Sequence, residues 1–284
     1  MIQIDELKFS YRGHCVYDGL NLELTDGALY GLMGRNGAGK TTLMKLIAGL
    51  LRCKEGRISV DGMKPSDRKP EFLDNVYFVP ESFNAPDIPV IEYAGSYGMF
   101  YSNYDGDAML EYLSVFGIEP QAVFRKLSAG QKKKALIAFA LALNTRLLLL
   151  DEPGNGLDIP SKLCLRRLLS EHVRPDRTIV LSTHQIRDVA DIVDHITVID
   201  CGKLLLNCTL EDISSRISFH IDDKAMQNSL FCERTAAGTV NILPYSESAD
   251  SGRIDLEVLF NACISGGKKF TEYLQKNNGT KKEV

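Results

Sequence analysis

The first eighty residues alternate apolar and polar positions in a way that predicts several short strands and one helix. MIQIDELKFSY at the start alternates like a half-buried strand, and LNLELTDGALYGLMG predicts a second strand, a turn and a third strand. The third strand runs directly into glycines, after which TTLMKLIAGLL has the apolar spacing of a helix. RISV at 57–60 and NVYFVP at 75–80 predict two further strands. Strands and a helix therefore alternate from the beginning of the chain.

The sequence pattern changes from Glu81 to about Lys126, where the residues are aromatic and acidic and the spacing is helical, with little strand character. Strand signals then return in RLLLLDEP and RTIVLSTH, which are continuous apolar runs that end abruptly in polar residues. Such runs are typical of parallel strands buried on both faces. HITVIDCGKLLL closes this region as a predicted hairpin near Leu206. The pattern predicts an α/β fold around a parallel sheet.

The pattern weakens beyond about Thr209. RISFHI, TVNILPY and DLEVLFNACI predict a small separate unit, which is interpreted either as a packing extension or as a regulatory or dimerising appendage. Both interpretations stay open. The lysine-rich end after Gln275 is predicted to be a frayed tail.

Composition excludes several classes of protein. The 284 residues are 44% hydrophobic and 25% charged, and the formal net charge of -4 gives no overall attraction to nucleic acid or to acidic lipid. The seven cysteines form no CxxC pair, so neither a zinc site nor a disulfide framework is indicated, and a reducing cytoplasm fits. No signal peptide is recognised, and no apolar run reaches the ~20 residues that cross a bilayer. Any membrane role must therefore come from a partner.

The stretch KLSAGQKKKALIAFA predicts a helix that begins near Ser128. Ser128 and Gln131 have the spacing of a capping box, in which each side chain satisfies a backbone amide of the first turn. The amides, the helix dipole and Lys132, Lys133 and Lys134 would together attract an anion. A solvated lysine face is the alternative, and for each lysine the two readings are equally open.

A phosphate-binding loop is predicted between the third strand and the first helix. GRNGAGKTT matches G-x-x-x-x-G-K-[ST] in the required setting, after a strand and before a helix, which disfavours a plain glycine-rich turn. Lys40 would reach the β and γ phosphates, and the Thr41 hydroxyl would bind Mg²⁺. The cradle comprises Gly34, Arg35, Asn36, Gly37, Ala38, Gly39, Lys40, Thr41 and Thr42.

LLLLDEP places two carboxylates at the end of a predicted parallel strand, where ligands bind in open α/β sheets. Asp151 would hold magnesium through water, and Glu152 would act as general base for the water that attacks the γ phosphate. Alone, two such acids would be a helix cap or a solvated turn. The phosphate cradle upstream favours the nucleotide interpretation.

Residues 1–208 resemble the ATP-binding subunit of an ABC transporter. The resemblance rests on motifs in the order of that family: GRNGAGKT, LSAGQ at 127–131, LLLLDEP, GNGLD at 154–158 and STH at 182–184. It implies an α/β P-loop NTPase core of the ABC type with an antiparallel β subdomain. It also implies a helical subdomain at about 82–143 that carries the LSAGQ signature, followed by a small C-terminal extension at 209–284.

The family's dimer gives the signature a role. Two cassettes associate head to tail, so the resemblance implies that Ser128, Gly130 and Gln131 close over ATP held by the other subunit. It also implies that Asp158 communicates between the two sites.

Two further residues take roles from the resemblance. It implies that Tyr11 stacks on adenine and that His184 contacts the γ phosphate. Taken alone, Tyr11 would be a half-buried strand residue and His184 a structural histidine.

Two positions depart from the family pattern. Ala129 replaces the commoner first glycine of the signature, and a methyl group there should be tolerated because Gly130 is retained. Glu81 stands where most members carry glutamine. A glutamate still accepts a bond from the metal's water shell but donates nothing. It resembles the bacterial ABC-2-type exporter subset, so export is expected.

The expected function is ATP hydrolysis that powers transport through a separate transmembrane permease subunit, with ATP and Mg²⁺ as cofactors. The expected partners are the permease and a second ATP-binding subunit, either a copy or a paralogue, at the cytoplasmic face of the membrane; no nucleic acid is expected. Translation or DNA-repair ABC ATPases are an alternative, disfavoured by the single cassette and by the lack of sustained heptads. A regulatory ATP-binding module is another, disfavoured by Glu152 and His184.

Overall fold

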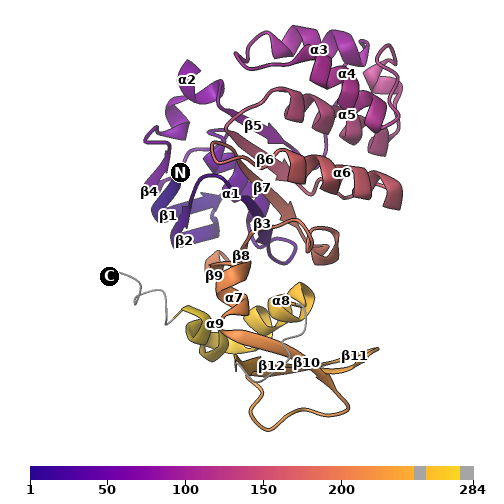
Figure 1. Cartoon of the computed structure of the whole chain (residues 1–284). Coiled ribbons are helices and arrows are strands. Elements are labelled where there is room, and N and C mark those ends of the chain that lie inside the picture. Colours follow the sequence, from indigo (N-terminus) through magenta and orange to yellow (C-terminus); the bar gives the residue numbers. More distant parts are fainter. Residues whose placement is uncertain (246–253, 276–284) are drawn as a thin grey trace.

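A six-stranded sheet forms the centre of the computed structural model, which describes residues 1–245 and 254–275 (Figure 1). The strand order is β5-β6-β7-β3-β8-β9, with all neighbours parallel except the β8 and β9 hairpin. The predicted hairpin is thereby confirmed. The strands are β3 (Leu29–Met33), β5 (Val76–Val79), β6 (Leu147–Asp151), β7 (Thr178–Thr183), β8 (His195–Asp200) and β9 (Lys203–Thr209).

Both faces of this sheet are covered, which explains the continuous apolar runs. In β6, Leu148 and Leu150 pack into one hydrophobic cluster, whereas Leu147 and Leu149 pack into the cluster on the opposite face. Successive side chains of a strand point to opposite faces, so a strand between two cores must be apolar at every position. The prediction of doubly buried parallel strands is confirmed.

An antiparallel sheet and the first helix cover one face. The strand order of this sheet is β2-β1-β4. Apolar side chains of the sheet and of α1 form one hydrophobic cluster with buried residues of the central sheet. The antiparallel β subdomain expected at the N-terminal side is present. The elements are β1 (Ile2–Tyr11), β2 (His14–Leu24), α1 (Lys40–Ile47), β4 (Glu55–Val60), η1 (Pro65–Asp67) and α2 (Pro70–Leu73).

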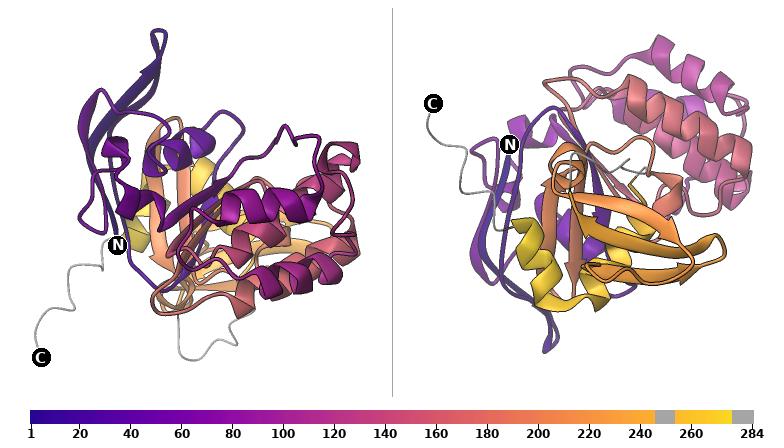
Figure 2. Two further views of the ribbon diagram at one scale, coloured as in Figure 1. Left: turned by 90° about the horizontal axis from the view of Figure 1, so that it is seen from above. Right: turned by 60° about the horizontal axis from the view of Figure 1, so that its bottom comes forward.

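Helices cover the opposite face. α5 is buried along nearly its whole length, and the Phe139 ring contacts the rings of Tyr77 and Tyr93. Figure 2 shows the helices α3, α4 and α5 on the side of the molecule away from the β1 and β2 ribbon. The elements are α3 (Val90–Gly98), α4 (Gly106–Val115), η2 (Phe124–Lys126), α5 (Ala129–Ala142), α6 (Ile159–Glu171) and η3 (Ile186–Asp188).

The C-terminal part forms a separate antiparallel sheet, order β10-β12-β11, with helices beside it. Phe219, Ile242 and Leu259 nevertheless belong to the same hydrophobic cluster as the helical face of the central sheet. This part therefore shares a core with the rest of the chain. The predicted frayed tail after Gln275 lies outside the described residues. The elements are α7 (Leu210–Ser214), β10 (Ile217–Asp222), β11 (Phe231–Thr235), β12 (Gly238–Pro244), α8 (Leu256–Ser265) and α9 (Gly267–Gln275).

Within the described ranges, every helix is too short or too polar to cross a membrane.

Candidate functional site

The predicted phosphate cradle is the loop between β3 and α1, and its shape requires glycine. Gly39 has φ 108°, and a Cβ added there would lie 2.4 Å from the Tyr17 hydroxyl oxygen. A Cβ on Gly34 would lie 2.5 Å from the carbonyl oxygen of Ile199. Gly39 also provides no side-chain cap for α1. The amides of the first turn of α1 therefore remain open to a phosphate group.

Lys40 begins α1 and turns back over the loop. Its Nζ donates to the carbonyl oxygens of Gly34 (2.7 Å) and Arg35 (3.3 Å) and lies 3.7 Å from Glu152 Oε1. Burial lowers the pKa of the Lys40 ammonium, while Glu152 and Asp151 oppose that shift. A phosphate oxygen would give this buried cation a second charged partner besides Glu152. Its position fits the predicted role.

The carboxyl end of β6 holds Asp151 and Glu152 beside β7. Asp151 is 1% exposed and lies opposite Ser182 in the parallel register. The Ser182 hydroxyl donates to Asp151 Oδ1 (2.6 Å) and accepts from the backbone N–H of Glu152 (3.0 Å). Sequence reasoning missed Ser182. The signal was present, because Ser182 begins the STH motif that was read only for its histidine.

Glu152 meets two of the other predicted catalytic residues. Its Oε2 lies 2.9 Å from Nδ1 of His184, and its Oε1 faces the Lys40 ammonium. Its backbone has φ 48°, the left-handed region that residues other than glycine rarely occupy. Two residues predicted from two other motifs, Lys40 and His184, therefore converge on the Glu152 carboxylate at the edge of the sheet.

The signature begins α5 as predicted. The Ser128 hydroxyl accepts from the Gln131 backbone N–H (3.2 Å), and Gln131 Oε1 accepts from the Ser128 N–H (3.0 Å), so the capping box is confirmed. A Cβ on Gly130 would lie 2.9 Å from the carbonyl oxygen of Gly156. Ala129 is exposed, so its methyl group is accommodated. Close packing against Gly156 therefore explains why Gly130 has no side chain, a reason that the sequence alone did not provide.

The three lysines after the signature differ from one another. Lys132 and Lys134 are half-buried, but Lys133 is 9% exposed and its Nζ donates to the carbonyl oxygen of Glu152 (2.9 Å). The solvated interpretation is therefore wrong for Lys133. Burial lowers the pKa of its ammonium, and Glu81, Asp151 and Glu152 oppose the shift.

Glu81 follows β5 and lies beside the signature. Its Oε1 accepts from Nδ2 of Asn155 (3.1 Å), a partner that sequence reasoning did not identify. Both residues line a pocket of about 520 Å³ together with Gly130 and Lys133. None of the cradle residues 34–42 lines this pocket. The metal contact of Glu81 stays a prediction.

Tyr11 and Asp158 occupy positions that are compatible with their expected roles. Tyr11 ends β1, is 43% exposed and contacts the Phe9 ring edge to face with 4.8 Å between ring centroids. Asp158 caps α6, because its Oδ1 accepts from the Ser161 backbone N–H (2.9 Å). Hydrogen bonds from the Ser161 side chain and from its backbone lower the pKa of the Asp158 carboxyl. Stacking on adenine and communication between subunits stay predictions.

Oxygen donors suit magnesium at this site. The Thr41 hydroxyl on α1 and the Asp151 carboxylate at the end of β6 are the hard ligands that Mg²⁺ takes alongside phosphate oxygens. The residues present therefore fit the expected metal.

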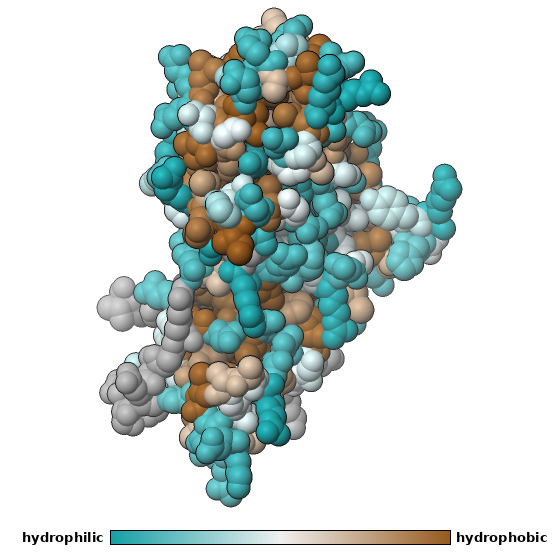
Figure 3. Space-filling model, turned by 90° about the vertical axis from the view of Figure 1, so that its right-hand side faces the viewer, coloured by the Kyte–Doolittle hydropathy of each residue, from teal (hydrophilic) through white to brown (hydrophobic). Residues whose placement is uncertain are grey.

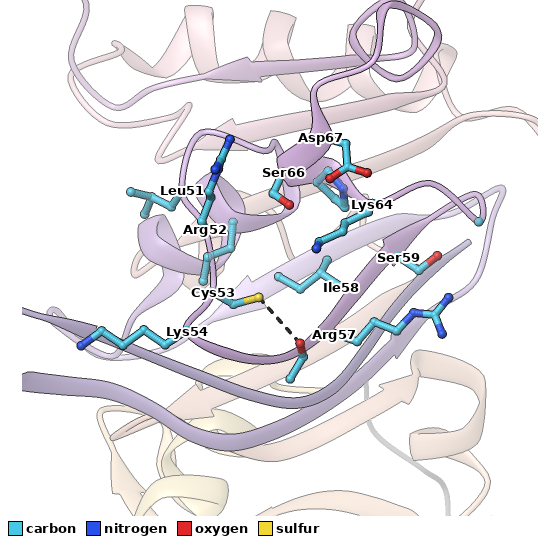
Figure 4. A pocket seen from close by; sticks show the side chains of 14 residues that line it. Leu51, Arg52, Cys53, Lys54, Arg57, Ile58, Ser59, Lys64, Ser66 and Asp67 are labelled. Atoms are coloured by element: carbon cyan, nitrogen blue, oxygen red, sulfur yellow. Dashed lines mark hydrogen bonds between the residues drawn. The ribbon is translucent and has the colours of Figure 1, made fainter.

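A pocket of greater volume lies elsewhere, between the end of α1, β4 and η1. Its volume is about 740 Å³, and Figure 4 shows Arg52, Lys54, Arg57 and Lys64 around it. No cradle residue and neither carboxylate of the DEP sequence lines it. Pocket size therefore does not locate the chemistry in this protein.

Comparison with known proteins identifies the family. A family profile described as ABC transporter matches residues 17–155. The chain is 31% identical over 209 residues to Nod factor export ATP-binding protein I of Cupriavidus metallidurans, covering 72% of this chain and 69% of that protein. It is 30% identical over 227 residues to a methionine import ATP-binding protein of Carboxydothermus hydrogenoformans, covering 75% and 67%. The solved structure of an ATP-binding subunit of an ABC transporter matches with a TM-score of 0.69 at 25% identity, covering 75% of this chain and 91% of that one. The chain belongs to the ABC transporter family of ATP-binding proteins.

Proposed function

We propose that residues 1–208 hydrolyse ATP in the cradle of 34–42 and thereby power transport through a separate transmembrane subunit. The observation that carries the proposal is the convergence of Lys40, Glu152 and His184, with Glu152 within 3.7 Å of Lys40 Nζ and 2.9 Å of His184 Nδ1. A nucleotide-binding module without turnover would have no use for a carboxylate and an imidazole aligned at the phosphate site. Membership of this ATPase family agrees with turnover.

Binding of ATP would use the start of α1. The first-turn amides and the Lys40 ammonium would bind the β and γ phosphates, and the Tyr11 ring would stack on adenine. Thr41 and Asp151 would hold Mg²⁺, with Glu81 near its water shell; the metal would offset the charge of the phosphate oxygens. Gly37 and Gly39 keep the loop backbone close to the ligand because no Cβ intervenes.

Hydrolysis would use the end of β6. A water oxygen would attack the γ phosphorus while Glu152 accepts a proton from that water, and the bond between the γ phosphorus and the bridging oxygen of ADP would break. With a proton on each ring nitrogen, His184 would donate from Nδ1 to Glu152 Oε2 and from Nε2 to an oxygen of the γ phosphate. The two residues would thus align the water and the phosphoryl group together.

A second cassette would complete the site. α5 begins with an intact capping box, and Gly130 is its second residue. The N-terminus of this helix would be a suitable partner for phosphate oxygens. We propose that Ser128, Gly130 and Gln131 of a second copy or a paralogue close over the ATP held by this chain. Asp158 would relay between the two sites.

The transmembrane subunit would dock on the helical face, at the cytoplasmic side of the membrane. Met99 and Phe100, directly after α3, are 75% and 71% exposed, and Figure 3 shows apolar side chains gathered on the upper part of this face. Tyr97 in the same segment is 49% exposed, and exposed apolar residues that gather in one patch are typical of interaction surfaces.

Ring contacts connect this surface to the loop that carries Glu81. Phe83 contacts Tyr93 at 5.8 Å between ring centroids, and Tyr93 contacts Tyr97 on the exposed side of α3 at 4.5 Å. Movement of the Glu81 loop would reach the docking surface through these rings. The relatives include an exporter and an importer, so the expectation of export depends on Glu81 alone.

The test is purification from detergent-solubilised membranes of the native host in the presence of MgATP. The Glu152→Gln form should bring down a multi-span membrane protein, and the same form carrying Met99→Ser and Phe100→Ser should recover much less of it. Recovery of ribosomes, of DNA or of no partner would contradict the transport proposal while leaving ATP hydrolysis untouched.

A further inference from the structure

Lys133 is the one residue of the lysine run after the signature that points into the protein. It lies in the first turns of α5, yet its Nζ reaches the carbonyl oxygen of Glu152 at the end of β6 (2.9 Å). We propose that Lys133 is a positioning residue for ATP hydrolysis, which holds the backbone of Glu152 so that its carboxylate faces the cradle. This inference rests on the proposed role of Glu152 as general base.

The backbone of Glu152 needs such support. Its φ of 48° lies in the left-handed region, which is unfavourable for an L-residue with a side chain. The surroundings hold it from both sides, because its N–H donates to the carbonyl oxygen (3.2 Å) and the hydroxyl (3.0 Å) of Ser182, and its carbonyl accepts from Lys133. Removing Lys133 would leave the Glu152 carbonyl with one donor, the Asn155 backbone N–H at 3.2 Å, and the direction of the Glu152 side chain would be less well defined.

Charge also favours an ammonium at this position. The carboxylates of Glu81, Asp151 and Glu152 act on the Lys133 ammonium, and Lys40 Nζ lies 3.7 Å from Glu152 Oε1. Three carboxylates against the single cation Lys40 would leave two negative charges in excess. With Lys133 present the excess falls to one, which favours the approach of a phosphate group that is itself negative.

The geometry also connects two functional elements of one subunit. Lys133 sits on the helix whose first residues carry the signature, and Gly130 on the same helix packs against the carbonyl of Gly156. A rotation of α5 would therefore displace the ammonium group that holds the Glu152 backbone. The signature helix, which would contact ATP of the partner, thus also adjusts the base of its own subunit.

The experiment compares Lys133→Met and Lys133→Arg with the parent in steady-state phosphate release, with ATP affinity and thermal melting measured in parallel. Lys133→Met should lower kcat by at least about tenfold while KM for ATP stays within about twofold, because the interaction acts on the reacting geometry and not on ATP binding. Lys133→Arg keeps a charged donor and should restore most of kcat. Lys126→Met is the matched control, since Lys126 is exposed and its side chain forms no hydrogen bond or ion pair within the described residues.

Several results would overturn the inference. One is that Lys133→Met and Lys126→Met release phosphate at the same rate. If Glu152→Gln abolishes turnover in the same experiment, the proposed function is left intact. A second is early melting of Lys133→Met with equal losses of kcat and ATP affinity, the result of a purely structural role. Lys133→Arg turnover as low as that of Lys133→Met would also overturn it. If instead Glu152→Gln keeps full turnover, the proposed function itself fails.

Discussion

Replacing Ser182 with alanine should destabilise the fold and impair hydrolysis together, because this hydroxyl connects both acidic residues at the end of β6. Ser182 is fully buried and donates to Asp151 Oδ1 at 2.6 Å. The Glu152 amide would keep a second acceptor, the Ser182 carbonyl at 3.2 Å, so the main loss falls on Asp151. A hydrogen bond to a charged group contributes roughly 1.5–3 kcal/mol, and a carboxylate that is 1% exposed has little access to a replacement water.

For a domain of about this size, each kcal/mol shifts Tm by roughly 2–4 °C, so Ser182→Ala should melt roughly 3–12 °C below the parent. Thermal melting followed by circular dichroism measures the shift, and phosphate release measures the accompanying loss of turnover. Ser59→Ala is the matched control, because Ser59 is a buried serine of β4 whose hydroxyl forms no hydrogen bond within the part of the chain that the structure describes. If Ser182→Ala melts at the same temperature as Ser59→Ala, the energetic role assigned to the Ser182 hydroxyl is wrong.

Two further predictions concern α6 and the signature. Burial lowers the pKa of His172, which bonds the Leu168 carbonyl (2.6 Å) and the Tyr112 hydroxyl (2.8 Å), so the unfolded chain binds its proton more readily. The free energy of unfolding should therefore fall as pH drops below 6.5, the ordinary pKa of histidine. Urea titrations above and below that pH should show a smaller fall for His172→Gln than for the parent. Gly130→Ala would place Cβ 2.9 Å from the Gly156 carbonyl, so it should lower phosphate release by about tenfold or more with little change in ATP affinity; unchanged release would show that the contact is not needed.

The local elements were predictable where one residue or one short pattern decides the structure. The run Leu147 to Leu150 is apolar at every position, which is typical of a strand covered on both faces. This run therefore predicted a parallel sheet. Ser128 and Gln131 satisfy each other's amides at fixed spacing, so the start of α5 followed from two residues.

The contacts between elements were not predictable, because they depend on how the elements pack. A run of three lysines on a helix carries no sign of which one turns inward, and only the approach of α5 to β6 buries Lys133. The same holds for the bond between Glu81 and Asn155, which joins two loops 74 positions apart. The C-terminal part gave a weak pattern because Phe219 and Ile242 bury against a core built by the rest of the chain.

The central claim is that Glu152 acts as the general base for hydrolysis of ATP bound in the cradle. Its most direct test is steady-state phosphate release by the parent and by Glu152→Gln, with ATP affinity measured on the same preparations. The account predicts that both forms bind ATP equally well and that release by Glu152→Gln falls by about a hundredfold or more, the range that general-base catalysis supplies. Equal release by the two forms would contradict it.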